Sequence, residues 1–334
     1  MTLAPWNLEA WNNLNERRRR GALPHAILLA GPAGLGKREF AEAFARALLC
    51  NSPREDGHAC DTCRACRFVA AGTHPDLVRI SFELRDDGKP RTELTVDQMR
   101  NLSERLTLTA QFGGAQIALI DPADAMNHAA SNALLKTLEE PTPGTIIVLV
   151  ANTPSRLSAT IRSRCQRIEF RVPETKAALQ WLAARGVSGK PAADALHASD
   201  GNPGLALDWA QGEALKLRGE VAKDLRELNA GVSAAFDVAQ RWSREESDLR
   251  LRFAASLVQQ QGRAQAHGGE ALSAGGPLAL TQAVDLAKLA AWFDRANRTR
   301  DLLRGPIRPE LAMLELLAAW TTAVAPNRNV QQGS

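Results

Sequence analysis

A glycine-rich segment near the amino terminus constrains the fold of this 334-residue chain more than any other feature. It reads GPAGLGK over residues 31–37, follows an apolar run at 24–30, and precedes a stretch in which Phe40, Phe44 and Leu48 recur every four residues. The apolar run indicates a buried strand, and the recurrence indicates an amphipathic helix. The order of strand, glycine loop and helix is typical of a P-loop, which binds polyphosphate through backbone N–H groups, the helix dipole and a lysine.

The loop supplies most of the candidate nucleotide-binding residues. Its glycines let the backbone approach phosphate oxygens closely, and its lysine adds a positive charge near the outer phosphates. The next position requires a Ser or Thr hydroxyl for Mg²⁺, but this chain has Arg38, whose guanidinium cannot ligate a cation. We therefore expect a degenerate site whose cofactor-binding residues are Gly31, Gly34, Gly36 and Lys37 from the loop, with Asp121 from a neighbouring strand.

A second departure lies at the end of that neighbouring strand. Asp121 follows the apolar run at 116–120, where a P-loop ATPase places its Mg²⁺ carboxylate, but Pro122 stands where the residue that polarises the attacking water is expected. Asp124 is the nearest replacement for such a base, although we interpret it first as the N-cap of the following helix. ATP or ADP can still bind, and we expect its hydrolysis to be very slow or absent.

The patterns along the chain predict three domains. Apolar runs at 24–30, 116–121 and 145–151, with a helical stretch at 124–140 between the last two, predict a parallel sheet covered by helices. Beyond the sheet region only helical patterns remain. The predicted fold class is α/β plus all-α, with a sheet domain at 1–172, a small helical domain at 173–212 and a domain of longer helices at 213–334.

The composition limits the classes of function. Hydrophobic residues make up 45% and charged residues 23%, and 41 basic against 37 acidic residues give a net charge of only +4. Contact with DNA would therefore have to come from local patches. No apolar run approaches the roughly 20 residues that cross a bilayer, and the amino terminus lacks a secretory signal pattern, so we expect a cytoplasmic protein without a membrane partner.

Several segments carry weaker signals. The glycine- and alanine-rich residues 262–276 are interpreted as a mobile loop, and the polar residues 326–334 as a frayed end. The basic run at 17–20 is interpreted as an exposed helix end. His58 and His74 are interpreted as solvated or capping residues, and the seven tryptophans as packing residues.

Four of the five cysteines form a cluster with the spacing C-x9-C-x2-C-x2-C. In a reducing compartment such clustering favours metal ligation over disulfides. Four thiolates fill the tetrahedral shell of Zn²⁺ and leave no open position, which predicts a structural site. Chance clustering and a redox pair are the alternatives. The predicted metal ligands are Cys50, Cys60, Cys63 and Cys66.

In combination, these features and two further motifs resemble the clamp-loader ATPases of the AAA+ class. The further motifs are NALLKTLEEP at 132–141 and Ser-Arg-Cys at 163–165, and together the motifs cover roughly residues 20–205. The resemblance implies an AAA+ P-loop sheet domain with an inserted zinc module at 50–66. It further implies a small helical lid and a C-terminal helical collar that assembles with related subunits.

The same resemblance implies a role for one arginine. Active motor subunits of this family carry the Mg²⁺ hydroxyl, a catalytic glutamate and a lid arginine, and this chain has Gly204 near the position expected for the last of these. It keeps Arg164 of the Ser-Arg-Cys motif, which the resemblance assigns as a catalytic arginine finger that acts in trans on a neighbour's ATP. Such an arginine stabilises charge on the transferring phosphoryl group.

The function that the resemblance implies is that of a non-hydrolysing, or very weakly hydrolysing, subunit of the bacterial DNA polymerase III clamp loader. Its partners would be the gamma or tau subunits and the delta subunit, in a hetero-oligomer that loads the sliding clamp onto primed DNA during replication. Alone, the chain would have no enzyme activity.

Two other functions stay open from the residues. One is a self-sufficient AAA+ ATPase motor that uses Asp124 as its base. The other is a zinc-stabilised DNA-binding module, which would bind DNA tightly and salt-sensitively without partners. The arginines that surround Arg164 are compatible with DNA-backbone contacts or with a solvated basic face; they are Arg156, Arg162, Arg167 and Arg171.

Overall fold

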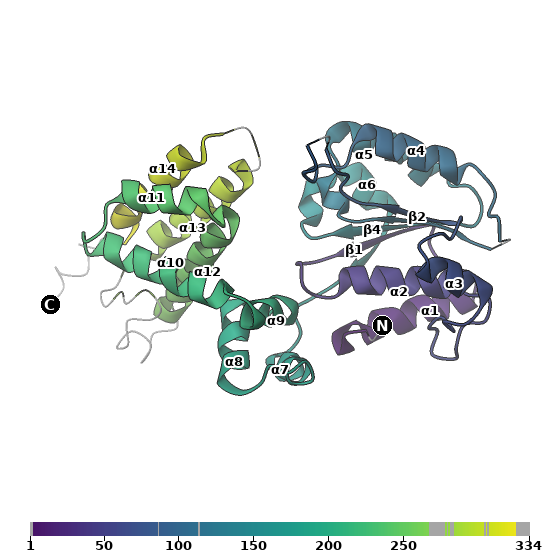
Figure 1. Ribbon diagram of the computed structural model, residues 1–334, viewed down its shortest axis with the longest axis horizontal. Helices are drawn as coiled ribbons and strands as arrows, with labels where there is room; N and C mark the ends of the chain where they lie inside the picture. Colours follow the sequence, from purple (N-terminus) through teal and green to yellow (C-terminus); the bar gives the residue numbers. More distant parts are fainter. Residues whose placement is uncertain are drawn as a thin grey trace. The chain divides into compact units, whose positions relative to one another are not determined.

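The chain consists of two compact units, one containing residues 1–188 and 201–205 and the other containing residues 189–200 and 206–334 (Figure 1). The computed structural model describes residues 3–85, 87–112, 114–266, 278, 280, 284–303, 305 and 307–324. The first unit holds the sheet, and the described residues of the second are mainly helical.

Five parallel strands form one sheet in the order β2-β3-β4-β1-β5. Strand β1 pairs with β4, where Ala30 lies opposite Ala151, and with β5, where Ala30 lies opposite Glu169. The loop that follows Ala30 therefore leaves the carboxyl edge of the sheet, where ligands bind in open α/β folds. The strands are β1 (Ala26–Ala30), β2 (Leu77–Ile80), β3 (Gln116–Ile120), β4 (Thr145–Ala151) and β5 (Gln166–Glu169).

Helices cover both faces of this sheet, as Figure 1 shows. Side chains alternate between the faces of a strand, so Ile27 joins one core with Trp11 and Phe40, while Leu28 joins the other with Met99. One face carries α1 (Leu8–Arg19), α2 (Lys37–Leu49) and α3 (Arg64–Ala70), and the other carries α4 (Val96–Leu106), α5 (His128–Glu139) and α6 (Ala159–Arg164). Shorter elements are η1 (Pro5–Asn7), η2 (Ala123–Ala125), η3 (Pro154–Arg156) and helix α7 (Thr175–Ala183).

The second unit packs its helices around buried tryptophans. The indole N–H of Trp242 donates to a carboxylate oxygen of Asp224 at 2.8 Å, and that of Trp320 donates to the carbonyl of Leu225 at 2.8 Å. These tryptophans are packing residues, as predicted. The helices are α8 (Gly189–Ala198), α9 (Pro203–Gln211), α10 (Ala214–Asn229), α11 (Ala235–Arg244), α12 (Ser247–Ala266), α13 (Leu286–Leu302) and α14 (Pro309–Ala323), of which α9 begins in the first unit.

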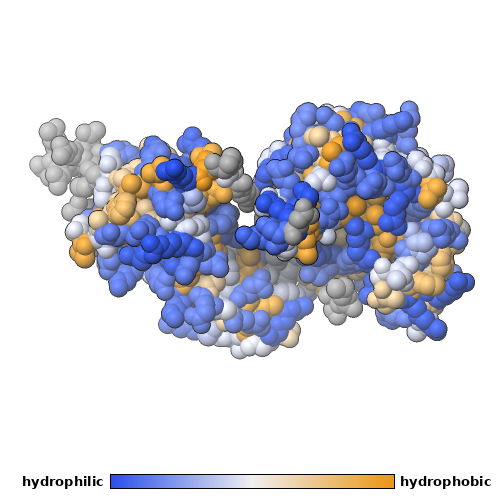
Figure 2. Space-filling model, turned by 45° about the horizontal axis from the view of Figure 1, so that its top comes forward, coloured by the Kyte–Doolittle hydropathy of each residue, from blue (hydrophilic) through white to orange (hydrophobic). Residues whose placement is uncertain are grey.

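Hydrophilic residues cover most of the face of the molecule shown in Figure 2, with apolar residues between them in smaller groups. Within the described residues, no helix combines the length and apolarity that crossing a membrane demands.

The predicted fold class, a parallel P-loop sheet followed by helices, is confirmed. The division at residues 172 and 212 stays a prediction. Several boundaries were wrong: the helix expected at 124–140 begins at His128, and helix α12 continues to Ala266, into the segment expected to be a loop. The rest of that segment and the tail at 326–334 lie outside the described residues.

Candidate nucleotide and metal sites

The P-loop connects β1 to α2 through backbone conformations that favour glycine. Gly31 has a φ of 146°, and a Cβ placed on it would lie 2.1 Å from the carbonyl oxygen of Phe170, the residue that follows β5. Gly34 and Gly36 both have a φ of 82°, in the left-handed region. The predicted loop therefore forms, and side chains at these positions would displace it.

Side chains from three parts of the chain hold the carbonyl groups of this loop. The Lys37 ammonium donates to the carbonyls of Gly31 at 2.7 Å and Pro32 at 2.6 Å. The Trp6 indole and the Asn7 amide both donate to the carbonyl of Leu35, at 3.1 and 2.9 Å. These contacts fix the conformation of the loop, which keeps its backbone arranged for an anion.

The start of α9 supplies the third contact. The Asn202 amide is buried and donates to the carbonyl of Ala33 at 2.6 Å, while its oxygen accepts from the backbone N–H of Leu205 at 3.2 Å. A Cβ placed on Gly204 would lie 2.1 Å from the carbonyl oxygen of Gly34. The backbone at Gly204 is therefore in direct contact with the P-loop.

Lys37 is nearly fully buried, at 3% exposure. Burial lowers the pKa of its ammonium to about 8, although Asp124 and Asp121 oppose this effect by electrostatic attraction. Lys37 and Asp121, which the sequence predicted to share a site, are therefore close enough to interact.

Arg38 forms an ion pair with the carboxylate of Asp121. The hydrogen bond from Arg38 Nε to this carboxylate raises the pKa of the guanidinium further. Arg38 stands where a hydroxyl that binds Mg²⁺ is expected. Its positive charge lies against Asp121, the carboxylate expected to bind Mg²⁺. The sequence predicted Arg38 as a replacement and Asp121 as a site residue, but the pairing of the two was not predicted.

The prediction that Asp124 caps the following helix was wrong. Asn127 caps α5, because its side chain accepts from the N–H of Ala130 at 2.9 Å. One carboxylate oxygen of Asp124 accepts from the N–H groups of Asn152 at 3.2 Å and Thr153 at 2.7 Å, and so fixes the chain after β4. Its other oxygen is buried without a hydrogen-bond partner among the described residues.

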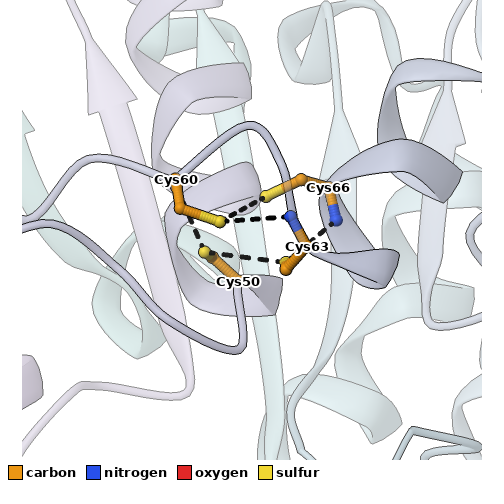
Figure 3. A group of neighbouring side chains, drawn as sticks. All are labelled: Cys50, Cys60, Cys63 and Cys66. Carbon is orange, nitrogen blue, oxygen red and sulfur yellow. Dashed lines mark hydrogen bonds between the residues drawn. The ribbon is translucent and has the colours of Figure 1, made fainter.

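The four clustered cysteines meet as predicted, and Figure 3 shows their side chains converging. Their sulfur atoms all lie within 4.8 Å of one another. The Sγ atoms of Cys50 and Cys63 are 3.9 Å apart, and those of Cys60 and Cys66 are 4.0 Å apart. Thiolates around a tetrahedral Zn²⁺ at about 2.3 Å lie roughly 3.8 Å from each other, so this donor set fits a metal ion.

The backbone of the cluster also favours thiolates. The N–H groups of Cys60, Cys63 and Cys66 each donate to the sulfur of the preceding cysteine in the cluster, at 3.2 to 3.4 Å. A hydrogen bond from Thr62 lowers the pKa of Cys60 to about 6, whereas burial raises that of Cys66. A bound cation would offset the cost of burying the Cys66 thiolate.

Helix α1 holds the cysteine module, residues 50–66, through contacts that sequence analysis missed. The ring of Trp11 stacks on His58 with centroids 4.3 Å apart, and its indole N–H donates to the carbonyl of Asp56 at 3.0 Å. Arg18 donates to the carbonyl of Gly57 at 3.4 Å, and Arg19 donates to that of Glu55. The basic run at 17–20 is the exposed end of α1, as interpreted, and it also contacts the module. His58 is not simply solvated.

His74 is not solvated, but it does cap a backbone N–H group. It is buried at 4% exposure, and its Nδ1 accepts from the N–H of Asp76 at 3.2 Å. Burial lowers the pKa of its imidazole. It takes no part in the cysteine cluster.

Arg164 lies at the opposite edge of the sheet from the P-loop. It ends α6, two residues before Gln166, where β5 begins. The P-loop instead follows Ala30, which pairs with Glu169 at the end of β5. The length of β5 alone separates these edges by about 10 Å. Arg164 and the candidate nucleotide-binding residues of the same chain are therefore not brought together.

Comparisons with known proteins place these features in a family. Residues 6–174 match the family model described as DNA polymerase III, delta subunit. The chain is 40% identical to DNA polymerase III subunit delta' of Pseudomonas aeruginosa, over 72% of this chain and 71% of that protein. It is 31% identical to subunit delta' of Yersinia pestis over 97% of both chains.

Among solved structures, the chain is similar to a gamma subunit-related protein of DNA polymerase III from Thermotoga maritima. The identity is 17%, the TM-score is 0.42, and the match covers 96% of this chain and 100% of the other. The sequence matches to the delta' proteins are the stronger finding, because they combine higher identity with coverage of most of both chains. The chain therefore belongs to the delta' subunit family of DNA polymerase III.

Proposed function

We propose that the chain is a clamp-loader subunit that does not hydrolyse ATP itself and instead supplies Arg164 to the ATPase site of a neighbouring subunit. Its membership of the delta' family supports a place in the clamp loader. The ion pair between Arg38 and Asp121 is the observation that carries the non-hydrolysing part of the proposal.

Hydrolysis in a P-loop site depends on a Mg²⁺ ion that bridges the phosphates and on a residue that orients the attacking water. Here the hydroxyl ligand is replaced by Arg38, whose guanidinium is bound to the carboxylate that Mg²⁺ would need. Pro122 stands at the expected position of the base. The contact of Gly204 with Gly34 also leaves no room for a side chain where a lid arginine would reach the phosphates.

Nucleotide binding is a separate matter from hydrolysis. The backbone N–H groups of the glycine loop, the amino-terminal end of α2 and the buried Lys37 provide the features that hold a polyphosphate. We propose that ATP or ADP can occupy this loop and that it stays intact there.

The position of Arg164 supports its action in trans. It lies at the amino edge of the sheet, and its guanidinium is bound to Glu139 at the end of α5 instead of pointing to its own P-loop. Its side chain is 33% exposed, so a docked protomer can reach it. In an assembly where the amino edge of one sheet faces the P-loop of the next subunit, the arginine would stabilise charge on the neighbour's transferring phosphoryl group.

The cysteine module has a structural role in this proposal. Zn²⁺ would bind Cys50, Cys60, Cys63 and Cys66, and four thiolates leave no coordination position for a substrate. When bound, the ion supplies charge that keeps these four side chains together. The module also rests on α1 through Trp11 and Arg18, so its attachment to the sheet does not depend on the metal alone.

The partners that we propose follow from the family. They are the gamma or tau and delta subunits of the clamp loader, and the assembled complex would load the sliding clamp onto primed DNA. The second unit, with its helices α10 to α14, is the candidate for the part that holds the assembly together.

Two assays test this proposal. The isolated chain should show no Mg²⁺-dependent ATP turnover above that of a Lys37→Ala variant. In a complex reconstituted with gamma and delta subunits, Arg164→Ala should lower steady-state ATPase activity, and Arg162→Ala, on the same helix, should not. Robust turnover by the chain alone would contradict the non-hydrolysing role.

One observation favours a second candidate function, that of a self-sufficient ATPase. One carboxylate oxygen of Asp124 is buried without a hydrogen-bond partner among the described residues, and the carboxylate is near enough to Lys37 to attract its ammonium. A carboxylate oxygen without a partner could accept a proton from an attacking water that enters the site with the nucleotide. If the isolated chain hydrolyses ATP, and Asp124→Ala abolishes this activity without changing nucleotide affinity, this second function replaces the first.

A further inference from the structure

The side chain of Arg164 is held by two contacts from different elements. Its Nη2 donates to a carboxylate oxygen of Glu139 at 2.5 Å, and its Nη1 donates to the carbonyl of Thr160 at 3.0 Å. Glu139 is the last residue of α5, and Thr160 lies one turn back in α6. The guanidinium is thus fixed between two helices at the amino edge of the sheet.

This arrangement sets Arg164 apart from the arginines around it. Within the described residues, the other ion pair of this group joins Arg167 to Glu169 of the same strand. No ion pair is found there for Arg156, Arg162 or Arg171. Within the described residues, Arg164 is therefore the arginine of this group that pairs with a carboxylate from a different element.

We infer that Glu139 is a positioning residue for Arg164, holding the guanidinium in a fixed direction before a neighbouring subunit docks. This inference rests on the proposed function of Arg164. Arginine has many side-chain conformers, and ordering it at the moment of phosphate contact would cost conformational entropy. An arginine already ordered by Glu139 and Thr160 meets a neighbour's phosphate with that cost reduced.

The pair leaves the guanidinium able to bind a phosphate. A guanidinium has five N–H donors, and the contacts to Glu139 and Thr160 use two of them. The remaining donors can form charge-assisted hydrogen bonds to phosphate oxygens. The carboxylate itself is 48% exposed, so this pair adds little to the stability of the fold. Its contribution is expected in the rate at the neighbour's site.

The experiment compares kcat and KM for ATP in the reconstituted complex. Glu139→Ala should lower kcat about threefold to tenfold and leave KM unchanged, because positioning acts on the transition state. Glu139→Gln keeps an oxygen acceptor without the charge and should fall between wild type and Glu139→Ala. Glu140→Ala, which removes the adjacent exposed glutamate, is the matched control and should have no effect.

A double-mutant cycle separates positioning from a general structural effect. In the Arg164→Ala background, Glu139→Ala should cause no further loss. The positioning role is wrong if Glu139→Ala lowers kcat by the same factor in the Arg164→Ala background as in the wild type. It is also wrong if Glu139→Ala raises kcat or leaves it unchanged in the wild type. In either case the proposed role of Arg164 survives. If Arg164→Ala itself has no effect, both the proposed function and this inference fail.

Discussion

Replacing Gly204 with alanine should destabilise the sheet unit, because two backbones touch at this position. The new Cβ would lie 2.1 Å from the carbonyl oxygen of Gly34, while ordinary contacts begin at 3.4 Å, so the two segments must separate by about 1.3 Å. A displacement of that size would stretch the 2.6 Å bond from Asn202 to Ala33 beyond hydrogen-bonding distance. Overpacking and the loss of a buried hydrogen bond together cost about 2–4 kcal/mol.

Hydrogen exchange of the β1 and P-loop amides, measured on the full chain, reports the opening free energy of this unit. Gly219→Ala is the control, because this helical glycine is exposed with open space around it, and alanine there should stabilise the chain by about 0.5–1 kcal/mol. The reasoning is refuted if Gly204→Ala protects these amides as well as the wild type does. That result would mean that the backbone at Gly204 does not contact the P-loop.

Three further predictions concern the bound groups. Elemental analysis should find about one zinc per chain in the wild type and in Cys165→Ser, and none in Cys66→Ser, whose melting temperature should fall; equal zinc in all three would contradict the assigned ligands. Burial lowers the pKa of Lys37 to about 8 from an unfolded value of 10.5, so the unfolded chain binds more protons between these pH values. The unfolding free energy of the wild type should therefore rise with pH across this window relative to Lys37→Met, and a parallel pH dependence in both proteins would exclude this effect. The Arg38→Ser substitution frees the Asp121 carboxylate. In this variant, calorimetry should show that ATP binds more tightly in Mg²⁺ than in EDTA. If the ATP affinity of the variant is the same in both, the ion pair is not what excludes the metal.

The sequence was sufficient for sites whose residues are close together along the chain. The P-loop glycines and the four cysteines carry their chemistry in their spacing, and the structure brings each set together. Helix α4 was missed although its signal was present: Thr95 and Gln98 form a capping box, and apolar residues follow at helical intervals. A systematic search for capping boxes would have found it.

Other features depended on tertiary structure. Three of the four residues of strand β5 are polar and exposed, so the strand has no apolar pattern to detect. It is a strand because it pairs with β1. The contact between Asn202 and Ala33 joins residues 169 positions apart, and no local pattern predicts it. The same holds for Glu139 and Arg164, which come from different helices.

The most direct test of the account is a single-turnover measurement of ATP hydrolysis at the neighbour's site in the reconstituted complex. With Arg164→Ala, the rate constant should fall by on the order of 10³, as expected for loss of an arginine finger. Arg164→Lys should recover only part of this loss, because an ammonium lacks the planar fork that binds phosphate at two points. A rate constant unchanged by Arg164→Ala, in a complex that still assembles, would contradict the central claim.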